Sequence, residues 1–95
     1  MNEARPPFDE AKLALIRDFL REHFPAHDRR DSFDFEMTAQ RFRLERGSHN
    51  RHSLIVPRET LDDIDLVSLL NVQLVDALNL AGAIPVMLTR QGPQY

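Results

Sequence analysis

The chain has 95 residues, of which 42% are apolar and 28% are charged, and its net charge at pH 7 is −3. These values are typical of one globular domain that carries no strong overall charge. Because the chain contains no cysteine, disulfides, thiolate metal sites and thiol catalysis are excluded.

Residues 1–7 contain no apolar run, so they do not resemble a secretory signal, and we expect them to form a disordered tail. No segment approaches the roughly 18 uncharged apolar residues that a membrane span needs. We therefore expect a cytoplasmic protein without a membrane partner. Its single α+β domain should cover residues 8–90 and be followed by a C-terminal tail at 91–95.

The first helix is predicted over residues 10–23. Asp9 is a suitable N-cap, and Phe8 can pack on Leu13 as a hydrophobic staple. Pro25 ends the helix because the residue before a proline is disfavoured in the helical conformation. The apolar positions that recur at helical spacing are Leu13, Ile16, Leu20 and Phe24.

Alternating apolar residues from Phe33 to Ala39 predict a half-buried strand that follows a polar connection at residues 25–31. The next apolar positions, Phe42 and Leu44, have the opposite parity, so one regular strand cannot place both sets on one face. A β-bulge near Gln40 or Arg41 would restore the register, as would a break between two short strands, and we favour the bulge. Residues 47–50 predict a turn, and residues 53–56 predict the second strand, which Pro57 ends.

A long second helix is predicted over residues 61–80, with Thr60 as its N-cap and Gly82 just beyond its end. A final strand follows at 84–88, where Pro85 requires a strand start or a sheet edge. The predicted fold is a two-layer α+β sandwich in the order α-β-β-α-β, with a three-stranded sheet and two helices on one face. This order resembles that of small BolA-like and class II KH-like domains, but the Gly-x-x-Gly loop of the latter is missing. No functional residue is carried over from either family.

Positive charge is concentrated in the predicted hairpin at residues 41–58, which has five arginines and one acidic residue, Glu45. Such a local field can attract an anion that the whole chain would repel. A solvated surface with paired arginines is the alternative interpretation. The candidate residues for binding an anion or a partner are Arg41, Arg43, Arg46, His49, Arg51, His52 and Arg58.

No metal site, cofactor or catalytic residue is predicted. His49 and His52 could share a zinc ion, but the nearest acid is Glu45 and a site needs three or four ligands. The acidic residues at 62, 63 and 65 are explained by the favourable charge at a helix N-terminus. There is no nucleophile motif and no glycine-rich phosphate loop, so we expect a protein that works by binding rather than by catalysis.

The second helix is apolar on more than one side, and its outer apolar residues are candidates for self-association. These residues are Leu61, Leu69, Val72 and Leu80. Asn71 lies among the apolar positions, where it would be either a hydrogen-bonded core asparagine or a residue that sets the register between subunits. The leading hypothesis is a protein-interaction domain with an unidentified partner that forms a homodimer through this helix. The alternative is binding of nucleic acid or another polyanion by the basic hairpin.

Overall fold

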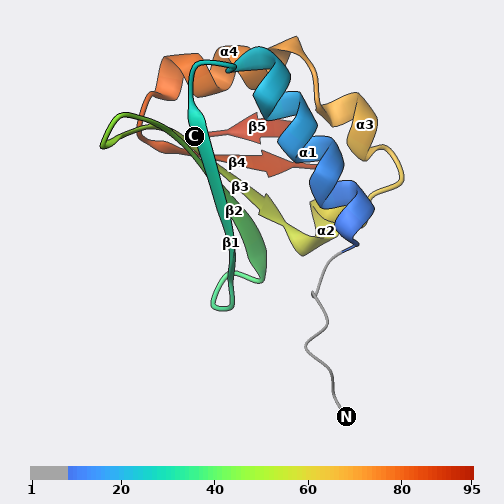
Figure 1. The fold of residues 1–95 in the computed structure, drawn as a ribbon. Coiled ribbons are helices and arrows are strands. Elements are labelled where there is room, and N and C mark those ends of the chain that lie inside the picture. The colour runs from blue at the N-terminus through green and yellow to red at the C-terminus, as the bar shows by residue number, and fades with distance from the viewer. Residues whose placement is uncertain (1–8) are drawn as a thin grey trace.

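A computed structural model of the protein describes residues 9–95 (Figure 1). The predicted tail at 1–7 and the predicted contact of Phe8 lie outside the described residues. The helices are α1 (Glu10–His23), α2 (Arg58–Leu61), α3 (Leu66–Leu69) and α4 (Val72–Ala81). The strands are β1 (Asp28–Asp34), β2 (Ala39–Arg46), β3 (His49–Pro57), β4 (Pro85–Thr89) and β5 (Gly92–Gln94).

The five strands form one mixed sheet in the order β1-β2-β3-β4-β5. All neighbouring strands are antiparallel except β3 and β4, which are parallel and are joined by the three helices that follow β3. The predicted class, α+β, agrees with this structure. The predicted three-stranded sheet and the order α-β-β-α-β are wrong, and the resemblance that rested on that order has no further support.

The first helix is confirmed with its predicted bounds. The Asp9 side chain caps α1 by accepting a hydrogen bond of 2.9 Å from the backbone N–H of Ala11. The residues of the predicted apolar stripe are all buried, at 0–5% exposure: Leu13, Ile16, Leu20 and Phe24. Spacing and capping therefore predicted this element correctly, since both signals are local in the sequence.

The predicted first strand is wrong, because a turn at residues 35–38 separates two strands of a hairpin. Asp34 stabilises the turn, since its Oδ1 accepts hydrogen bonds from the N–H groups of Glu36 and Met37. Phe35 lies in this turn and is 83% exposed. The favoured bulge near Gln40 or Arg41 is therefore wrong, and the alternative, a break between two short strands, is right, although the break lies at residues 35–38. The bulge lies elsewhere, opposite Leu44 and Glu45 in the β2–β3 ladder.

The predicted second helix is also wrong, because residues 58–81 form three short helices. Asn71 is not a core residue but the N-cap of α4, where its Oδ1 accepts hydrogen bonds from the N–H groups of Gln73 and Leu74. Thr60 is not a cap either, since it lies within α2 and is fully buried. Its hydroxyl donates a hydrogen bond of 2.8 Å to the carbonyl of Leu88 and thereby fixes α2 to β4. Among the described residues, no helix is long and apolar enough to cross a membrane.

The predicted C-terminal tail contains the fifth strand, β5, which pairs with β4. Gly92 has a φ of 117°, a conformation that residues with a side chain rarely adopt, and it begins the returning strand. Thr89 closes the turn, since its hydroxyl donates a hydrogen bond of 2.7 Å to the carbonyl of Gly92. Pro93, which has no backbone N–H, is compatible with β5 because this strand lies at the sheet edge. On the outer side of an edge strand no neighbouring strand needs a hydrogen-bond donor.

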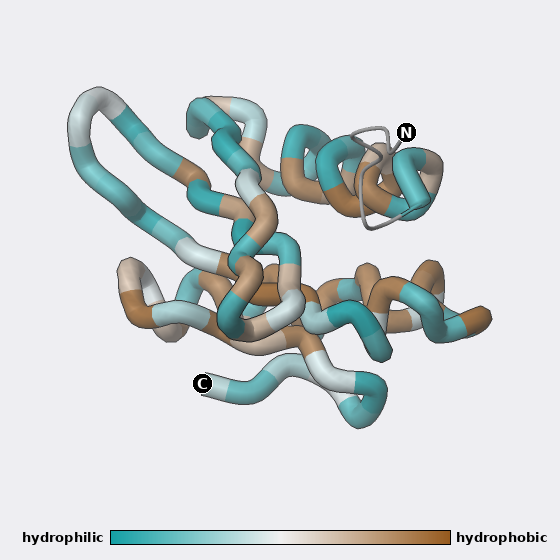
Figure 2. The backbone as a smooth tube through the Cα atoms, turned by 90° about the horizontal axis from the view of Figure 1, so that it is seen from below, coloured by the Kyte–Doolittle hydropathy of each residue, from teal (hydrophilic) through white to brown (hydrophobic). Residues whose placement is uncertain are grey.

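Both α1 and α4 pack on one face of the twisted sheet (Figure 1). The strand residues of this helix-covered face belong to the hydrophobic core: Phe42, Leu44, Leu54, Val56, Val86 and Leu88. Across the ladders, Leu54 lies opposite both Phe42 and Val86. In Figure 2 the apolar segments are concentrated in the helices and in the middle of the sheet, whereas the end of the β2–β3 hairpin is hydrophilic. The opposite face, called the open face below, carries the alternate residues of each strand.

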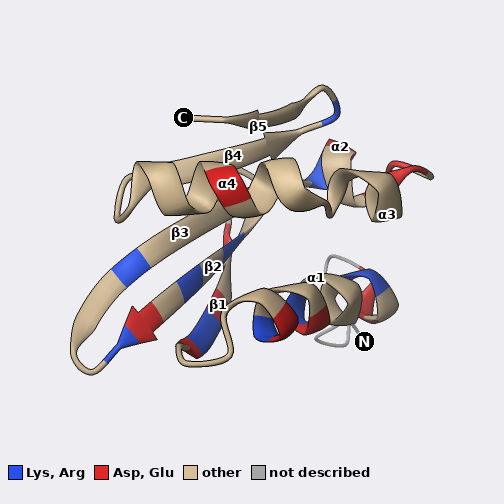
Figure 3. Cartoon of the chain, turned by 90° about the horizontal axis from the view of Figure 1, so that it is seen from above, with Lys and Arg blue, Asp and Glu red and all other residues tan. Residues whose placement is uncertain are grey.

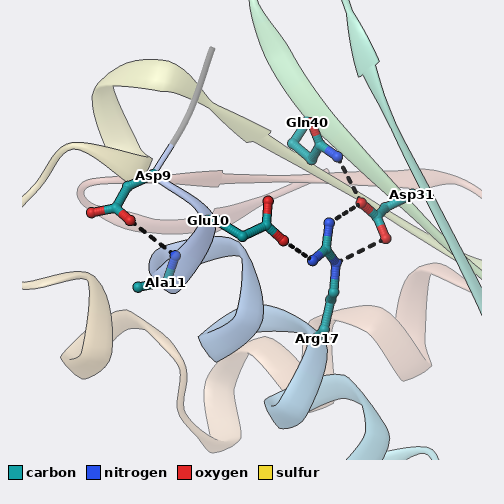
Figure 4. Close-up of polar contacts among 6 residues, drawn as sticks. All are labelled: Asp9, Glu10, Ala11, Arg17, Asp31 and Gln40. Carbon is teal, nitrogen blue, oxygen red and sulfur yellow. Dashed lines mark hydrogen bonds and ion pairs between the residues drawn. The ribbon is translucent and has the colours of Figure 1, made fainter. Parts of the chain in front are cut away.

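An ion-pair network holds α1 on β1 at the helix-covered face (Figure 4). Arg17 of α1 binds both carboxylate oxygens of Asp31, with its Nε 3.1 Å from Oδ1 and its Nη2 2.8 Å from Oδ2. The same Oδ2 accepts a hydrogen bond of 2.7 Å from Gln40 of β2, and Arg17 also bonds Glu10 at 2.6 Å. Burial by itself would raise the pKa of Asp31, but the hydrogen bonds from Arg17 and Gln40 outweigh it and hold that pKa below its usual range.

Candidate anion-binding site

The candidate site lies on the open face of β1 and β2, where basic residues meet across the antiparallel ladder. Arg30 of β1 is directly opposite Arg43 of β2, and Ser32 is directly opposite Arg41. Directly opposite residues of an antiparallel pair have Cβ atoms about 4.5–5.5 Å apart. The ladder therefore brings three guanidinium groups and one hydroxyl to the same patch, which we call the arginine site.

A cavity of about 300 Å³ opens at the arginine site. Its lining residues are Arg30, Asp31, Ser32, Arg41 and Arg43. The carboxylate of Asp31 is bound by Arg17 and Gln40 at the helix-covered face. The side chains that the cavity offers to a ligand are therefore the three arginines and the serine. Guanidinium groups bind carboxylates and phosphates through pairs of parallel hydrogen bonds.

The three arginines differ in the acids that accompany them. The Nε of Arg30 lies 3.4 Å from Oε1 of Glu45 at one end of the site. At the other end, the Nε of Arg41 lies 3.1 Å from Oδ2 of Asp34. The Nε of Arg41 is buried without a well-oriented hydrogen-bond acceptor, despite its closeness to Asp34. Arg43 is exposed and has no ion pair or side-chain hydrogen bond within residues 9–95. The centre of the site thus carries positive charge that the described side chains leave unneutralised.

The remaining basic residues of the predicted hairpin lie outside the arginine site. Arg46, His49 and Arg51 are exposed at the end of the β2–β3 hairpin, where Arg51 is the extra residue of the β-bulge. Arg58 belongs to α2 and lies 3.6 Å from Asp62, its neighbour one helical turn away. Figure 3 shows this distribution, with basic segments along β2 and β3 and a single acidic segment on α4. The structure therefore brings Arg41 and Arg43 together and places the other candidates elsewhere.

His52 has a structural contact instead of facing solvent at the turn. Its Nδ1 lies 2.8 Å from the carbonyl of Leu78 in α4, and its ring lies 4.9 Å from the ring of Phe24. The His27 ring lies beside it at a tilt of 54°, with the two imidazole centroids 5.3 Å apart. Burial lowers the pKa of His27, and the neighbouring charges of His52, Arg46 and Arg51 lower it further. These histidines pack the end of α1 against the hairpin and α4.

No group of three or more metal-ligating side chains is present among residues 9–95. The acidic cluster after α2 has local partners, since Asp63 accepts a hydrogen bond of 2.8 Å from the backbone N–H of Asp65 and lies 4.0 Å from Arg90. The expectation that these acids favour the start of a long helix fails, because α2 ends at Leu61. Their positions fit a loop between α2 and α3.

The residues proposed for self-association are distributed over two environments. Leu61 is 1% exposed and belongs to the core, and Leu69 is partly buried against it. Val72 and Leu80 are exposed at opposite ends of α4. The four residues therefore do not form the continuous apolar stripe that a single long helix would have presented.

Two residues of the arginine site, Arg30 and Ser32, were missed by the sequence interpretation. The segment 25–31 reads as a polar connection because β1, Asp28–Asp34, has a single apolar residue. The change of parity after Ala39 was the signal that could have revealed a hairpin and hence a partner strand for β2. Searches of protein-family models, curated proteins and solved structures find nothing that matches this chain.

Proposed function

We propose that the protein is a non-enzymatic binding module that holds a phosphate or carboxylate group of its ligand at the arginine site. The observation that carries this proposal is the direct opposition of Arg30 and Arg43 on the open face. Like charges directly opposite each other destabilise a sheet. An anion between them removes the repulsion and adds charge-assisted hydrogen bonds, so the arrangement favours the bound state.

The acidic residues around the arginine site limit the size of its ligand. Along the open face, Asp28 and Glu45 form the ladder pair on one side of the site, and Asp34 lies on the other. Along the strands, each of these positions is two residues, or about 7 Å between Cα atoms, from the nearest ladder pair of the site. A long, uniformly charged chain such as a nucleic acid would meet these carboxylates. The surface therefore favours a compact anionic group over the extended polyanion predicted from the hairpin.

Self-association through the region of the predicted second helix has weaker support. Leu61 and Leu69 are needed for the core, and Val72 and Leu80 are eight positions apart on α4. At 1.5 Å per residue, these two side chains are separated by about 12 Å along the helix. Asp76 and Asn79 occupy the exposed surface between them. Val72 and Leu80 therefore do not by themselves form a continuous apolar surface for a second copy.

Calorimetric titration of the protein with pyrophosphate at low and physiological salt tests the proposal. We expect saturable binding that weakens as salt rises, because salt screens exposed charge pairs. Arg43→Gln should abolish this binding, whereas the matched control Arg51→Gln should retain it, since Arg51 is an exposed arginine of the same hairpin outside the site. Glutamate-rich peptides in place of pyrophosphate distinguish a carboxylate ligand from a phosphate ligand.

Two results would refute the proposal. The first is the absence of pyrophosphate and peptide binding at low salt. The second is an equal loss of affinity in Arg43→Gln and Arg51→Gln, which would indicate general attraction by the hairpin. Binding of random RNA that depends on Arg46 and Arg51, but not on Arg43, would instead favour the polyanion hypothesis at the hairpin end.

A further inference from the structure

The outer edge of β1 offers a surface of its own, independent of the arginine site. β1 is seven residues long and lies at the end of the sheet. Its ladder with β2 is regular, with no bulge, and the strand contains no proline. Among residues 9–95, no backbone hydrogen bond joins this outer edge to another segment. Such an edge presents unpaired N–H and C=O groups to another strand.

Charges on edge strands usually oppose pairing, and in β1 their effect depends on the register in which a second strand pairs with it. On the open face it carries Asp28, Arg30, Ser32 and Asp34 in sequence. If a second copy paired antiparallel with Asp31 at the two-fold axis, Asp28 would lie opposite Asp34 and the carboxylates would repel each other. A shift that places Ser32 at the axis separates Asp28 from Asp34 and puts Arg30 opposite Asp34 twice. Asp28 then faces Glu36, which lies in the turn beyond the end of β1 and not in a strand.

The same register is complementary at the helix-covered face. There Arg29 would lie beside Phe35 of the other copy, the first turn residue beyond the end of β1, again twice because of the two-fold symmetry. Phe35 is 83% exposed and is held in place by an edge-to-face contact with Phe33, whose ring centroid is 4.6 Å away. A guanidinium over an aromatic ring is attracted by its π electrons. The exposed ring of Phe35, which has no other explanation in the fold, would therefore gain a cationic partner.

We propose that the protein forms a two-fold symmetric dimer in which β1 pairs antiparallel with β1 of a second copy, with the two Ser32 residues opposite each other. The two five-stranded sheets then become one continuous sheet, as in other isologous interfaces built from a self-complementary surface. Both arginine sites lie on the same face of this sheet. The dimer places self-association on β1 instead of the second helix and does not depend on anion binding.

The absence of cysteine from the chain allows a direct test by cross-linking. In Ser32→Cys the two thiols would face each other, with Cα atoms about 4.5–5.5 Å apart, which is within the range for a disulfide. Asp28→Cys is the matched control on the same strand and face, since the proposed register keeps its two copies eight strand positions apart, or about 27 Å. We expect mild oxidation to cross-link Ser32→Cys much faster than Asp28→Cys at equal concentration.

A second variant tests the charge complementarity. Arg30→Glu placed in the Ser32→Cys background replaces two attractive pairs by two repulsive ones. It should slow the cross-linking at Ser32 by roughly tenfold or more without changing the circular dichroism spectrum. The proposal is overturned if both cysteine variants cross-link at the same rate or if Arg30→Glu leaves the rate unchanged. It is also overturned if sedimentation finds only monomer at the highest soluble concentration of the wild-type chain.

Discussion

Replacement of Asp31 by asparagine should destabilise the fold by removing the charge at the centre of the network that joins α1 to the sheet. The carboxylate of Asp31 accepts three hydrogen bonds, two from Arg17 and one from Gln40. An asparagine has almost the same shape, but one of its two terminal atoms is a donor. In either orientation a donor of the new amide faces a donor of Arg17 or Gln40, so at least one bond is lost.

The size of the effect follows from the burial of the partners. The Asp31 side chain is 18% exposed and the Arg17 side chain 35% exposed, so solvent screens the pair in part. Hydrogen bonds to charged groups contribute about 1.5–3 kcal/mol, and a partly exposed pair such as this one falls at the lower end. We therefore expect the free energy of unfolding at pH 7 to fall by about 2 kcal/mol. For a chain of this length that corresponds to a decrease in Tm of roughly 8–16 °C.

Urea unfolding followed by circular dichroism between pH 7 and pH 2.5 measures this effect. Because the pKa of Asp31 is lowered in the folded state, its stabilisation is complete above the ordinary aspartate pKa of about 3.9. The stabilisation is lost as the pH falls through the lower folded-state pKa, where the wild type and Asp31→Asn should converge. The reasoning is refuted if Asp31→Asn changes the stability at pH 7 by less than about 0.5 kcal/mol or if the difference persists in acid.

Three further predictions concern single contacts. Asn71→Ala should lower the free energy of unfolding by about 1 kcal/mol in urea titrations, because α4 loses its N-cap. Asn71→Leu should also destabilise the fold, whereas leucine would be tolerated if Asn71 were a core residue. Thr60→Val should cost about 1–3 kcal/mol by the same measurement, because the buried carbonyl of Leu88 loses its donor; a neutral result would contradict that hydrogen bond. The lowered pKa of His27 predicts that stability falls as the pH drops from about 6.5 toward the folded-state pKa, since the unfolded chain takes up the proton first. His27→Gln should remove this decrease, and an unchanged pH profile of Tm would argue against it.

The elements that the sequence predicted correctly have local signals. Helix α1 combines a capping Asp9 with a regular apolar stripe and a terminating Pro25. The β2–β3 turn contains Gly47, whose φ of 64° favours glycine, and the last helix ends before Gly82 with a φ of 60°. In each case a residue and its near neighbours determine the backbone, so no knowledge of distant contacts is needed.

The elements that the sequence did not predict depend on tertiary pairing or on weak breaks. β1 has a composition typical of a loop and becomes a strand because β2 is regular enough to pair with it. The breaks between α2, α3 and α4 occur without proline or glycine, so apolar spacing alone reads as one helix. β5 has three residues that include Gly92 and Pro93, a composition that also fits a tail. Arg41 and Arg43 could be predicted as site residues because they lie in a recognisable hairpin. Arg30 could be assigned to the site only from the observed β1–β2 ladder.

β1 connects the stability of the fold with its proposed functions, because its successive residues point to opposite faces of the sheet. Asp31 faces α1 and binds Arg17, whereas Arg30 faces the open side and lies opposite Arg43. The ion pair at Asp31 orients the strand that presents Arg30 and Ser32, so a loss of α1 docking would also disturb the arginine site and the strand edge. Substitutions at Arg30 remove the charge from the open face while the network at Asp31 stays intact. Asp31→Asn should therefore lower stability, whereas Arg30→Gln should weaken anion binding with little effect on stability. Comparing the two variants separates folding from binding at two adjacent residues.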